Sequence, residues 1–456
     1  MDIQALVQAQ RAYFQTGATL PVAVRRAALS RLGRAIRAWE REICAALASD
    51  LNKSPTESYM CEVGMTLSEL SFVEKRLTHW AKDKVHPTPL AQFHAKSFTV
   101  SEPYGVVLIM SPWNYPFMLT MEPLIGALAA GNCCVVKPSA YSPAVSAVIR
   151  TVLTDCFHQQ YVSVVEGGRA ENQALLNQKF DYIFFTGGVE VGKEVMSKAA
   201  RRLTPVTLEL GGKSPCIVDA TARLDLAAKR LVFGKLLNCG QTCVAPDYLL
   251  IDRRVKGLFL RHVQKWISKM YGSNALDNRG YVRMVNRKHF DRVVGLIDPK
   301  KAVYGGRSDP ETLKIQPTIL DGVSPEDPVM QEEIFGPVLP VLTFDRVNEA
   351  LDFVNSRPRP LALYLFSQDK RTQQLFLRQA SFGGGCINDT VIHLATSRMG
   401  FGGVGESGMG SYHGRASFDT FSHQKSVVKK STWMDLPIRY PPYSPVKDKL
   451  LRMFLR

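Results

Sequence analysis

The chain has 456 residues, of which 45% are hydrophobic, and its 57 Lys and Arg exceed its 41 Asp and Glu by a formal net charge of +16. This length and composition allow large buried cores in two or three domains, and exclude a disordered tail. The basic charge would suit an anionic partner, but no nucleic-acid-binding motif accompanies it, so we predict no nucleic-acid partner.

The N-terminal segment carries no targeting signal. It lacks a cationic start followed by an apolar stretch and a cleavage site, and no uncharged apolar run approaches the ~20 residues that span a bilayer. The nine cysteines are an odd number without a Cys-x-x-Cys pair, which argues against a disulfide framework. We therefore expect a cytoplasmic location.

The first predicted elements are helices with a basic outer face. Between Arg25 and Arg41, apolar residues recur at helical spacing while the opposite face carries the charge, so we predict a solvated helical stripe. From Gly105 the chain alternates strand-like and helix-like stretches, beginning GVVLIM, FMLTMEPLIGALAAG and CCVVK. A second alternating series begins at CIVDA. Continuous apolar strands between helices predict an α/β fold with parallel sheets, whose ligands bind at the carboxyl ends of the strands.

Two phosphate-like motifs follow. GGVEVGK, residues 187 to 193, has P-loop spacing, but Glu194 stands where Ser or Thr should bind magnesium, which argues against an ATPase. We favour a dinucleotide pyrophosphate at this helix N-terminus. GVGESG, residues 403 to 408, matches Gly-x-Gly-x-x-Gly without opening a strand-helix-strand unit, so we interpret it as a loop at an active site or an interface.

Four polar residues occupy apolar, loop-like settings. Asn114, Lys137 and Glu209 have ordinary explanations, respectively a turn amide, a surface lysine and half of a buried ion pair. Together with Cys243 they also fit attack of a thiolate on a carbonyl, with an amide to hold the oxyanion and a carboxylate to activate water. A cysteine with a pKa of ~8.5 is only about 3% thiolate at pH 7, so such a nucleophile needs activation.

Cys239 lies four residues before Cys243 in GKLLNCGQTCVAPDY. No nearby His or Cys supplies further ligands, so we predict no metal site. A redox pairing of the two thiols stays open as oxidative side chemistry. We favour a packing role for Cys239 at the end of the preceding helix.

Four motifs in order, PWNYP, LELGGKSP, GQTCVAPDY and EEIFGPVLP, resemble the NAD(P)-dependent aldehyde dehydrogenase superfamily, and PLALYLFS, GMGSYHG and RYPPY resemble its class 3 branch. The resemblance covers about residues 10 to 443. It implies a homodimer and an aldehyde dehydrogenase-like fold. The implied parts are a Rossmann-type cofactor domain (1–81 and 102–208), an α/β catalytic domain (209–411), a small β oligomerisation segment (82–101 and 412–430) and a basic C-terminal tail (431–456).

The resemblance also implies roles. Cys243 would attack the aldehyde, Asn114 and the Cys243 backbone N–H would hold the oxyanion, and Glu209 would activate water to hydrolyse the thioester. The carboxylate matching Glu333 shares the base role in some relatives, so that division stays open. The implied contacts of NAD or NADP are Trp113, Lys137, Gly187, Gly192, Glu333 and Phe335, and those of a small-molecule aldehyde, medium- to long-chain aliphatic or aromatic, are Tyr115, Phe233, Leu237 and Thr242.

The chain departs from the family pattern at two places. Many relatives read Lys-Pro-Ser-Glu where this chain has KPSA, and because nothing acidic replaces Ala140 locally, we expect NADP to be accepted at least comparably to NAD. The chain ends in KDKLLRMFLR, with neither a spanning segment nor a lipidation box. We expect weak contact of this basic tail with anionic membrane, or binding to the protein's own surface.

Two other functions stay open. Acyl transfer to coenzyme A or phosphate would use the same thioester, although Glu209 favours hydrolysis. A non-catalytic protein with this fold is the other alternative, but the joint presence of Asn114, Glu209, Cys243 and Glu333 argues against it.

Overall fold

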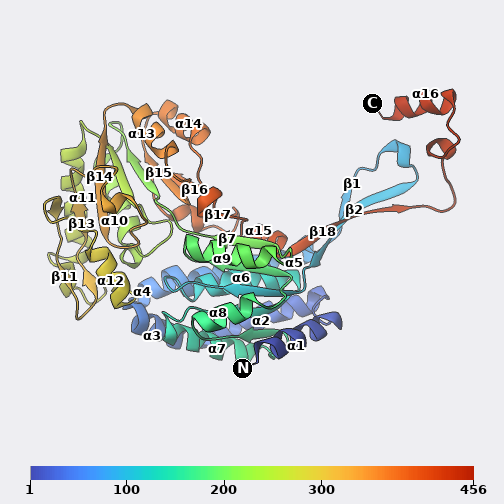
Figure 1. Ribbon diagram of the computed structural model, residues 1–456, viewed down its shortest axis with the longest axis horizontal. Helices are drawn as coiled ribbons and strands as arrows, with labels where there is room; N and C mark the ends of the chain where they lie inside the picture. Colours follow the sequence, from blue (N-terminus) through green and yellow to red (C-terminus); the bar gives the residue numbers. More distant parts are fainter. Residues whose placement is uncertain (1, 456) are drawn as a thin grey trace.

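The molecule has two large sheets in its body and a smaller sheet that projects from it as an arm (Figure 1). The computed structural model describes residues 2–455. In both body sheets every neighbouring pair of strands is parallel except for one antiparallel edge strand. The predicted α/β fold class is confirmed.

The first sheet has six strands in the order β17-β7-β6-β3-β4-β5. The strands are β3 (Val106–Met110), β4 (Cys133–Lys137), β5 (Val162–Val164), β6 (Tyr182–Thr186), β7 (Val206–Glu209) and β17 (Gly408–Met409). Because β3, β4, β6 and β7 are parallel, their last residues Met110, Lys137, Thr186 and Glu209 all lie at one edge of the sheet. This edge carries the residues that the sequence singled out.

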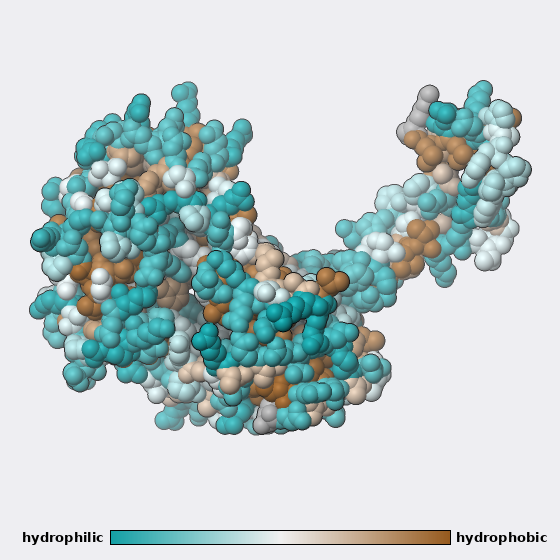
Figure 2. Space-filling model, viewed as in Figure 1, coloured by the Kyte–Doolittle hydropathy of each residue, from teal (hydrophilic) through white to brown (hydrophobic). Residues whose placement is uncertain are grey.

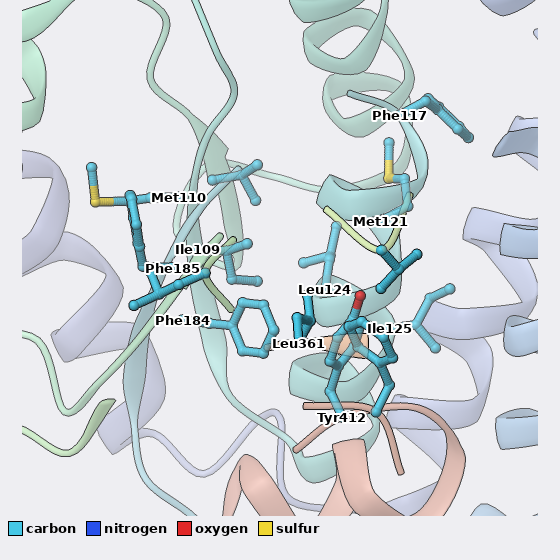
Figure 3. Packing of buried hydrophobic residues seen from close by; sticks show 14 of the residues in the cluster. Ile109, Met110, Phe117, Met121, Leu124, Ile125, Phe184, Phe185, Leu361 and Tyr412 are labelled. Atoms are coloured by element: carbon cyan, nitrogen blue, oxygen red, sulfur yellow. The ribbon is translucent and has the colours of Figure 1, made fainter. Parts of the chain in front are cut away.

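Helices cover both faces of this sheet (Figure 1). They are α1 (Ile3–Gln15), α2 (Val22–Ala38), α3 (Glu40–Leu51), α4 (Pro55–Ser58), the π-helical turn η1 (Tyr59–Val63), α5 (Gly64–Trp80), α6 (Met118–Ala130), α7 (Pro143–Cys156), α8 (Arg169–Leu176), α9 (Val189–Ala200) and α15 (Gly414–Thr420). Every residue of α6 is buried. Figure 3 shows its side chains Leu124 and Ile125 in the same apolar cluster as Ile109 and Phe184 of the sheet, with Tyr412 beside them.

The second sheet has seven strands in the order β10-β13-β14-β9-β8-β15-β16. They are β8 (Pro215–Val218), β9 (Tyr248–Asp252), β10 (Ala302–Tyr304), β13 (Thr318–Leu320), β14 (Val338–Phe344), β15 (Ala362–Phe366) and β16 (Gly384–Ile387). Its helices are α10 (Leu224–Leu236), α11 (Lys256–Tyr271), α12 (Arg287–Val294), α13 (Val347–Asn355) and α14 (Lys370–Gln379), and a separate short hairpin pairs β11 (Ser308–Asp309) with β12 (Lys314–Ile315).

The arm is a three-stranded antiparallel sheet of β1 (Lys84–His86), β2 (Ala95–Pro103) and β18 (Ser422–Lys430), followed by α16 (Pro445–Phe454). Two segments far apart in sequence thus pair along their whole length, whereas α15, just before β18, packs on α5 and α6 of the body. Figure 2 shows apolar surface on the arm, where Val446, Met453 and Leu455 are exposed. Within residues 2–455, no helix combines the length and apolar character needed to cross a membrane.

Two local expectations need correction. The stripe from Arg25 to Arg41 is not one helix, because α2 ends at Ala38 and α3 begins at Glu40, with Trp39 between them. Its apolar side chains are nevertheless in the core, as the spacing indicated. Glu209 does not lie inside a strand but is the last residue of β7, where the sheet opens toward the cavity described below.

Candidate active site

Cys243 lies where two cavities meet, one of about 460 Å³ and one of about 220 Å³. The only other residue in the described chain that borders both is Leu119, near the start of α6. Cys243 follows a tight bend in which Asn238, Cys239 and Gly240 have φ of 53°, 56° and 73°. A Cβ at Gly240 would lie 2.3 Å from the Gly336 carbonyl oxygen, so this turn requires glycine.

Asn114 lies in the loop between β3 and α6 and faces the loop of Cys243. Its buried side-chain amide donates one hydrogen bond from Nδ2 to the Gln241 carbonyl, 3.0 Å away. A side-chain amide has two N–H donors, so the second is free for a ligand in the larger cavity, which Asn114 also lines. The structure thus brings Asn114 and Cys243 together at one cavity.

The larger cavity has the features of a dinucleotide site. Gly187 and Gly188 lie between β6 and the N-terminus of α9, and a Cβ at Gly188 would meet nothing within 4 Å, so the backbone is open to a ligand. Trp113 and Phe335 form an aromatic wall with ring centroids 5.3 Å apart. The residues present therefore fit NAD(P), and the described chain contains no cluster of three or more His, Cys, Asp or Glu able to hold a metal.

Glu209 faces this larger cavity from the end of β7. Both of its carboxyl oxygens are buried and have no hydrogen-bond partner among the described residues. Burial raises the pKa of Glu209 well above its ordinary value, so its carboxyl is neutral at neutral pH in this state. An unpartnered carboxyl beside Cys243 is suited to hold a water molecule.

Glu333 enters the same cavity from the opposite side. Burial, with Asp247 as a further cause, raises the pKa of Glu333 to about 8. A Cβ at Gly211 would lie 2.0 Å from Glu333 Oε2, so Gly211 makes room for this carboxyl. Arg292 holds the loop by donating to the carbonyls of Glu333 and Ile334, 3.2 and 2.6 Å away.

The Cys243 thiol is also in an environment that disfavours charge. Burial, and then the carboxyls of Glu333 and Glu209, raise the pKa of Cys243 to about 12. The structure shows no cation that would offset these effects among the first causes. In this state the thiol is therefore protonated at neutral pH.

The smaller cavity is lined almost entirely by apolar side chains. The four substrate-pocket residues named from the sequence all border it, and the hydroxyls of Tyr115 and Thr242 are hydrogen-bonded at 2.7 Å. Its other apolar walls come from Met60, Met65, Met118, Leu119, Val391, Ile392, Leu394 and Phe401. Unbranched methionines adapt to irregular shapes, so this cavity suits flexible apolar groups.

One charged pair also borders this apolar cavity. His413 Nε2 lies 3.2 Å from Glu122 Oε2, and the ring stacks on Phe401 at 5.6 Å between centroids. Burial alone would lower the pKa of His413, but Glu122 and Glu69 raise it. The sequence did not indicate this pair.

Two predicted cofactor residues do not border the larger cavity. Lys137 is buried at the end of β4, and its Nζ donates to the Pro138 carbonyl at 2.8 Å. Gly192 is a packing position, since a Cβ there would lie 2.6 Å from Leu210 Cδ2. Cys239 is also away from both cavities, and its Sγ contacts the Tyr281 hydroxyl at 3.3 Å, which agrees with a packing role.

The structure corrects the view that nothing acidic lies near Ala140. Burial lowers the pKa of the Lys137 ammonium, but the carboxylates of Glu171 and Glu166 act in the opposite direction. These two come from the turn between β5 and α8, which the local sequence around Ala140 does not show. Both are committed, because Glu166 pairs with Arg150 at 3.0 Å and Glu171 accepts from the Gly168 N–H at 2.7 Å.

Sequence reasoning missed several residues of the site. His289 and Arg292 line the larger cavity from α12, and burial, with the charges of Arg292 and Lys288, lowers the pKa of His289 to about 4. Lys53 and Glu62 lie beneath Asn114 and Tyr115. A signal existed for Glu62, since it falls on the apolar face formed by Val63, Thr66, Leu70 and Val73, where a carboxylate needs an explanation.

Comparison with known proteins gives consistent matches. Residues 1–427 match the model of the aldehyde dehydrogenase family. The chain is 46% identical over 448 residues to the 4,4'-diaponeurosporen-aldehyde dehydrogenase of Staphylococcus aureus, covering 98% of this chain and 97% of that protein. It is 43% identical over 443 residues to the dimeric NADP-preferring aldehyde dehydrogenase of Canis lupus familiaris, covering 96% of this chain and 98% of that protein.

A solved structure is equally similar. The substrate-bound state of Staphylococcus aureus AldH superposes with a TM-score of 0.98 at 45% identity and covers 100% of both chains.

The raised pKa of Cys243 makes a testable prediction for the free protein. Below a pKa of about 12, the thiolate fraction rises tenfold with each pH unit, so the rate at which iodoacetamide alkylates Cys243 should rise about tenfold per unit from pH 7 to pH 9 without levelling off. The rate is followed by mass spectrometry of the peptide that contains Cys243. A rate that levels off near pH 7 would show a stabilised thiolate and contradict this account.

Proposed function

The chain belongs to the aldehyde dehydrogenase family, in its class 3 branch, and we propose that Cys243, Asn114 and Glu209 carry out its NAD(P)-dependent oxidation of aldehydes to carboxylic acids. The observation that supports these roles most strongly is the position of Cys243 between an apolar cavity and a cavity with dinucleotide features. An aldehyde and a cofactor that enter from opposite sides meet at its sulfur.

The first step is attack on the aldehyde. Cys243 Sγ bonds to the carbonyl carbon, and the carbonyl oxygen takes the negative charge. The free N–H of Asn114 and the Cys243 backbone N–H donate to this oxygen. Because the Asn114 amide is already oriented by Gln241, it does not have to reorganise when the charge develops.

The second step transfers a hydride from the resulting thiohemiacetal. When bound, the oxidised nicotinamide supplies the hydride acceptor and a positive charge. Positive charge beside Cys243 and Glu209 lowers the pKa of both groups, which would oppose the effects of burial. Loss of the hydride leaves a thioester on Cys243.

The third step is hydrolysis. Glu209 takes a proton from a water molecule, whose oxygen attacks the thioester carbon, and the acid and the Cys243 thiol are released. Its unpartnered oxygens favour Glu209 over Glu333 as this base, because the Glu333 carboxyl is engaged by the Gly212 N–H. The same observation favours hydrolysis over acyl transfer to coenzyme A or phosphate.

The smaller cavity supports an apolar aldehyde as substrate. Its wall includes three methionines and its polar groups are few, so medium- to long-chain aliphatic or aromatic aldehydes fit better than small hydrophilic ones. The similarity to an enzyme named for diaponeurosporen-aldehyde, which is 46% identical, agrees with this class.

We also propose a homodimer that uses the arm. A relative that is 43% identical is named dimeric, and the arm exposes Val428, Trp433 and Tyr443 as well as the apolar side chains of α16.

Replacing the nucleophile tests the assignment. Cys243→Ala should abolish nicotinamide reduction, measured by absorbance with an apolar aldehyde, because no thiohemiacetal can form. Cys239→Ala is the matched control and should keep most of the activity, since Cys239 lies outside both cavities. Equal loss in both variants would overturn the assignment.

The cofactor proposal is that NADP is accepted at least comparably to NAD. Ala140→Glu should lower kcat/KM for NADP about tenfold or more by repulsion of the 2'-phosphate, and should leave kcat/KM for NAD nearly unchanged. The two cofactors are compared side by side with the same aldehyde. A hundredfold preference of the unmodified protein for NAD would refute the proposal.

A further inference from the structure

We propose that Lys53 is a positioning residue for Asn114, and that the short segment from Lys53 to Glu62 holds the Asn114 loop and the Cys243 loop in their relative places. The inference rests on the role proposed above for Asn114. It concerns residues that touch neither the substrate nor the cofactor cavity through their charged groups.

Lys53 is directed at the backbone of Asn114. It follows α3 and is 1% exposed, and its Nζ donates to the Asn114 carbonyl oxygen at 3.0 Å. The same Nζ pairs with Glu62 and lies 4.1 Å from the centroid of the Tyr115 ring. All contacts of this ammonium group are therefore to the Asn114 loop or to Glu62.

Glu62 fixes the other end of that loop. Its second oxygen accepts from the backbone N–H groups of Phe117 and Met118, at 2.9 and 3.1 Å. These N–H groups lie at the start of α6, where they have no partner within the helix. The Lys53–Glu62 pair thus holds the chain on both sides of Asn114 and Tyr115.

The Asn114 carbonyl also receives a donor from the nucleophile loop. Asn238 Nδ2 donates to it at 2.8 Å, and Glu57 accepts from the Asn238 N–H at 2.8 Å. Asn238 has a φ of 53°, so this residue is held in a conformation that needs support. The segment that carries Lys53 and Glu62 therefore reaches the Cys243 loop as well, through Glu57.

The local backbone fits this role. Glu62 lies in the π-helical turn η1, which is inserted between α4 and α5. Such turns are uncommon and occur often at functional sites. A charge-assisted hydrogen bond from a buried ammonium restrains a carbonyl more firmly than a neutral donor would, and a displacement of about 1 Å at a catalytic group can lower a rate about a hundredfold.

The main test removes both charges at once, because Lys53→Met alone would leave Glu62 buried without a partner. In the double variant Lys53→Met and Glu62→Gln, the single-turnover rate of nicotinamide reduction should fall about 10- to 100-fold. The alkylation of Cys243 by iodoacetamide, which forms no oxyanion, should change less than about twofold. Cofactor binding, measured by titration, should be unchanged.

A cycle with Asn114→Ala identifies the route of the effect. If Lys53 and Glu62 act through the Asn114 amide, the double variant should lower the rate less than about threefold when Asn114 is already Ala. The same 10- to 100-fold loss in both backgrounds would overturn the inference, and so would an equal fall in alkylation. If Asn114→Ala alone kept the full rate, the role of Asn114 would fail instead.

Two further variants complete the design. Lys53→Arg keeps a cation and should retain more of the rate than the double variant, whereas equal loss would contradict a role for the charge-assisted bond. Lys256→Met removes a cation that pairs with Asp321 at 2.9 Å away from both cavities, and should leave the rate unchanged.

Discussion

The chemistry depends on desolvation at the point where the two cavities meet. Burial keeps the Cys243 thiol and the Glu209 carboxyl in their neutral forms until a positive charge enters the larger cavity. A thiol and a carboxyl of this kind become strong nucleophile and strong base once they lose their protons. The same environment that makes them inert in the free protein therefore prepares them for the reaction.

The parallel sheet explains why these groups come together. Strands β3, β6 and β7 end at one edge, and the loops or residues at these ends are Asn114, Gly187 and Glu209. Cys243 comes from the other sheet, in the bend before β9. The site therefore lies between the two body sheets, and a buried segment beneath it, which includes Lys53 and Glu62, contacts both loops.

The sequence predicted the parts of this arrangement that have local patterns. The buried strands of the first sheet have continuous apolar sequences, and Asn114, Glu209 and Cys243 stand out as polar groups beside them. It could not show contacts between distant segments, such as Lys53 with Asn114 or the carboxylates of Glu166 and Glu171 near Lys137. The methionine-lined wall was also hidden, because Met60 and Met65 lie in a helical segment that reads as ordinary packing.

The account is tested most directly by stopping the reaction after hydride transfer. In Glu209→Gln, no carboxylate can take the proton from water, so incubation with an apolar aldehyde and cofactor should let the thioester accumulate. Intact-mass spectrometry should then show the chain heavier by the aldehyde less two hydrogens, with the added group on the Cys243 peptide. Full turnover without an adduct, or an adduct on another residue, would contradict the account.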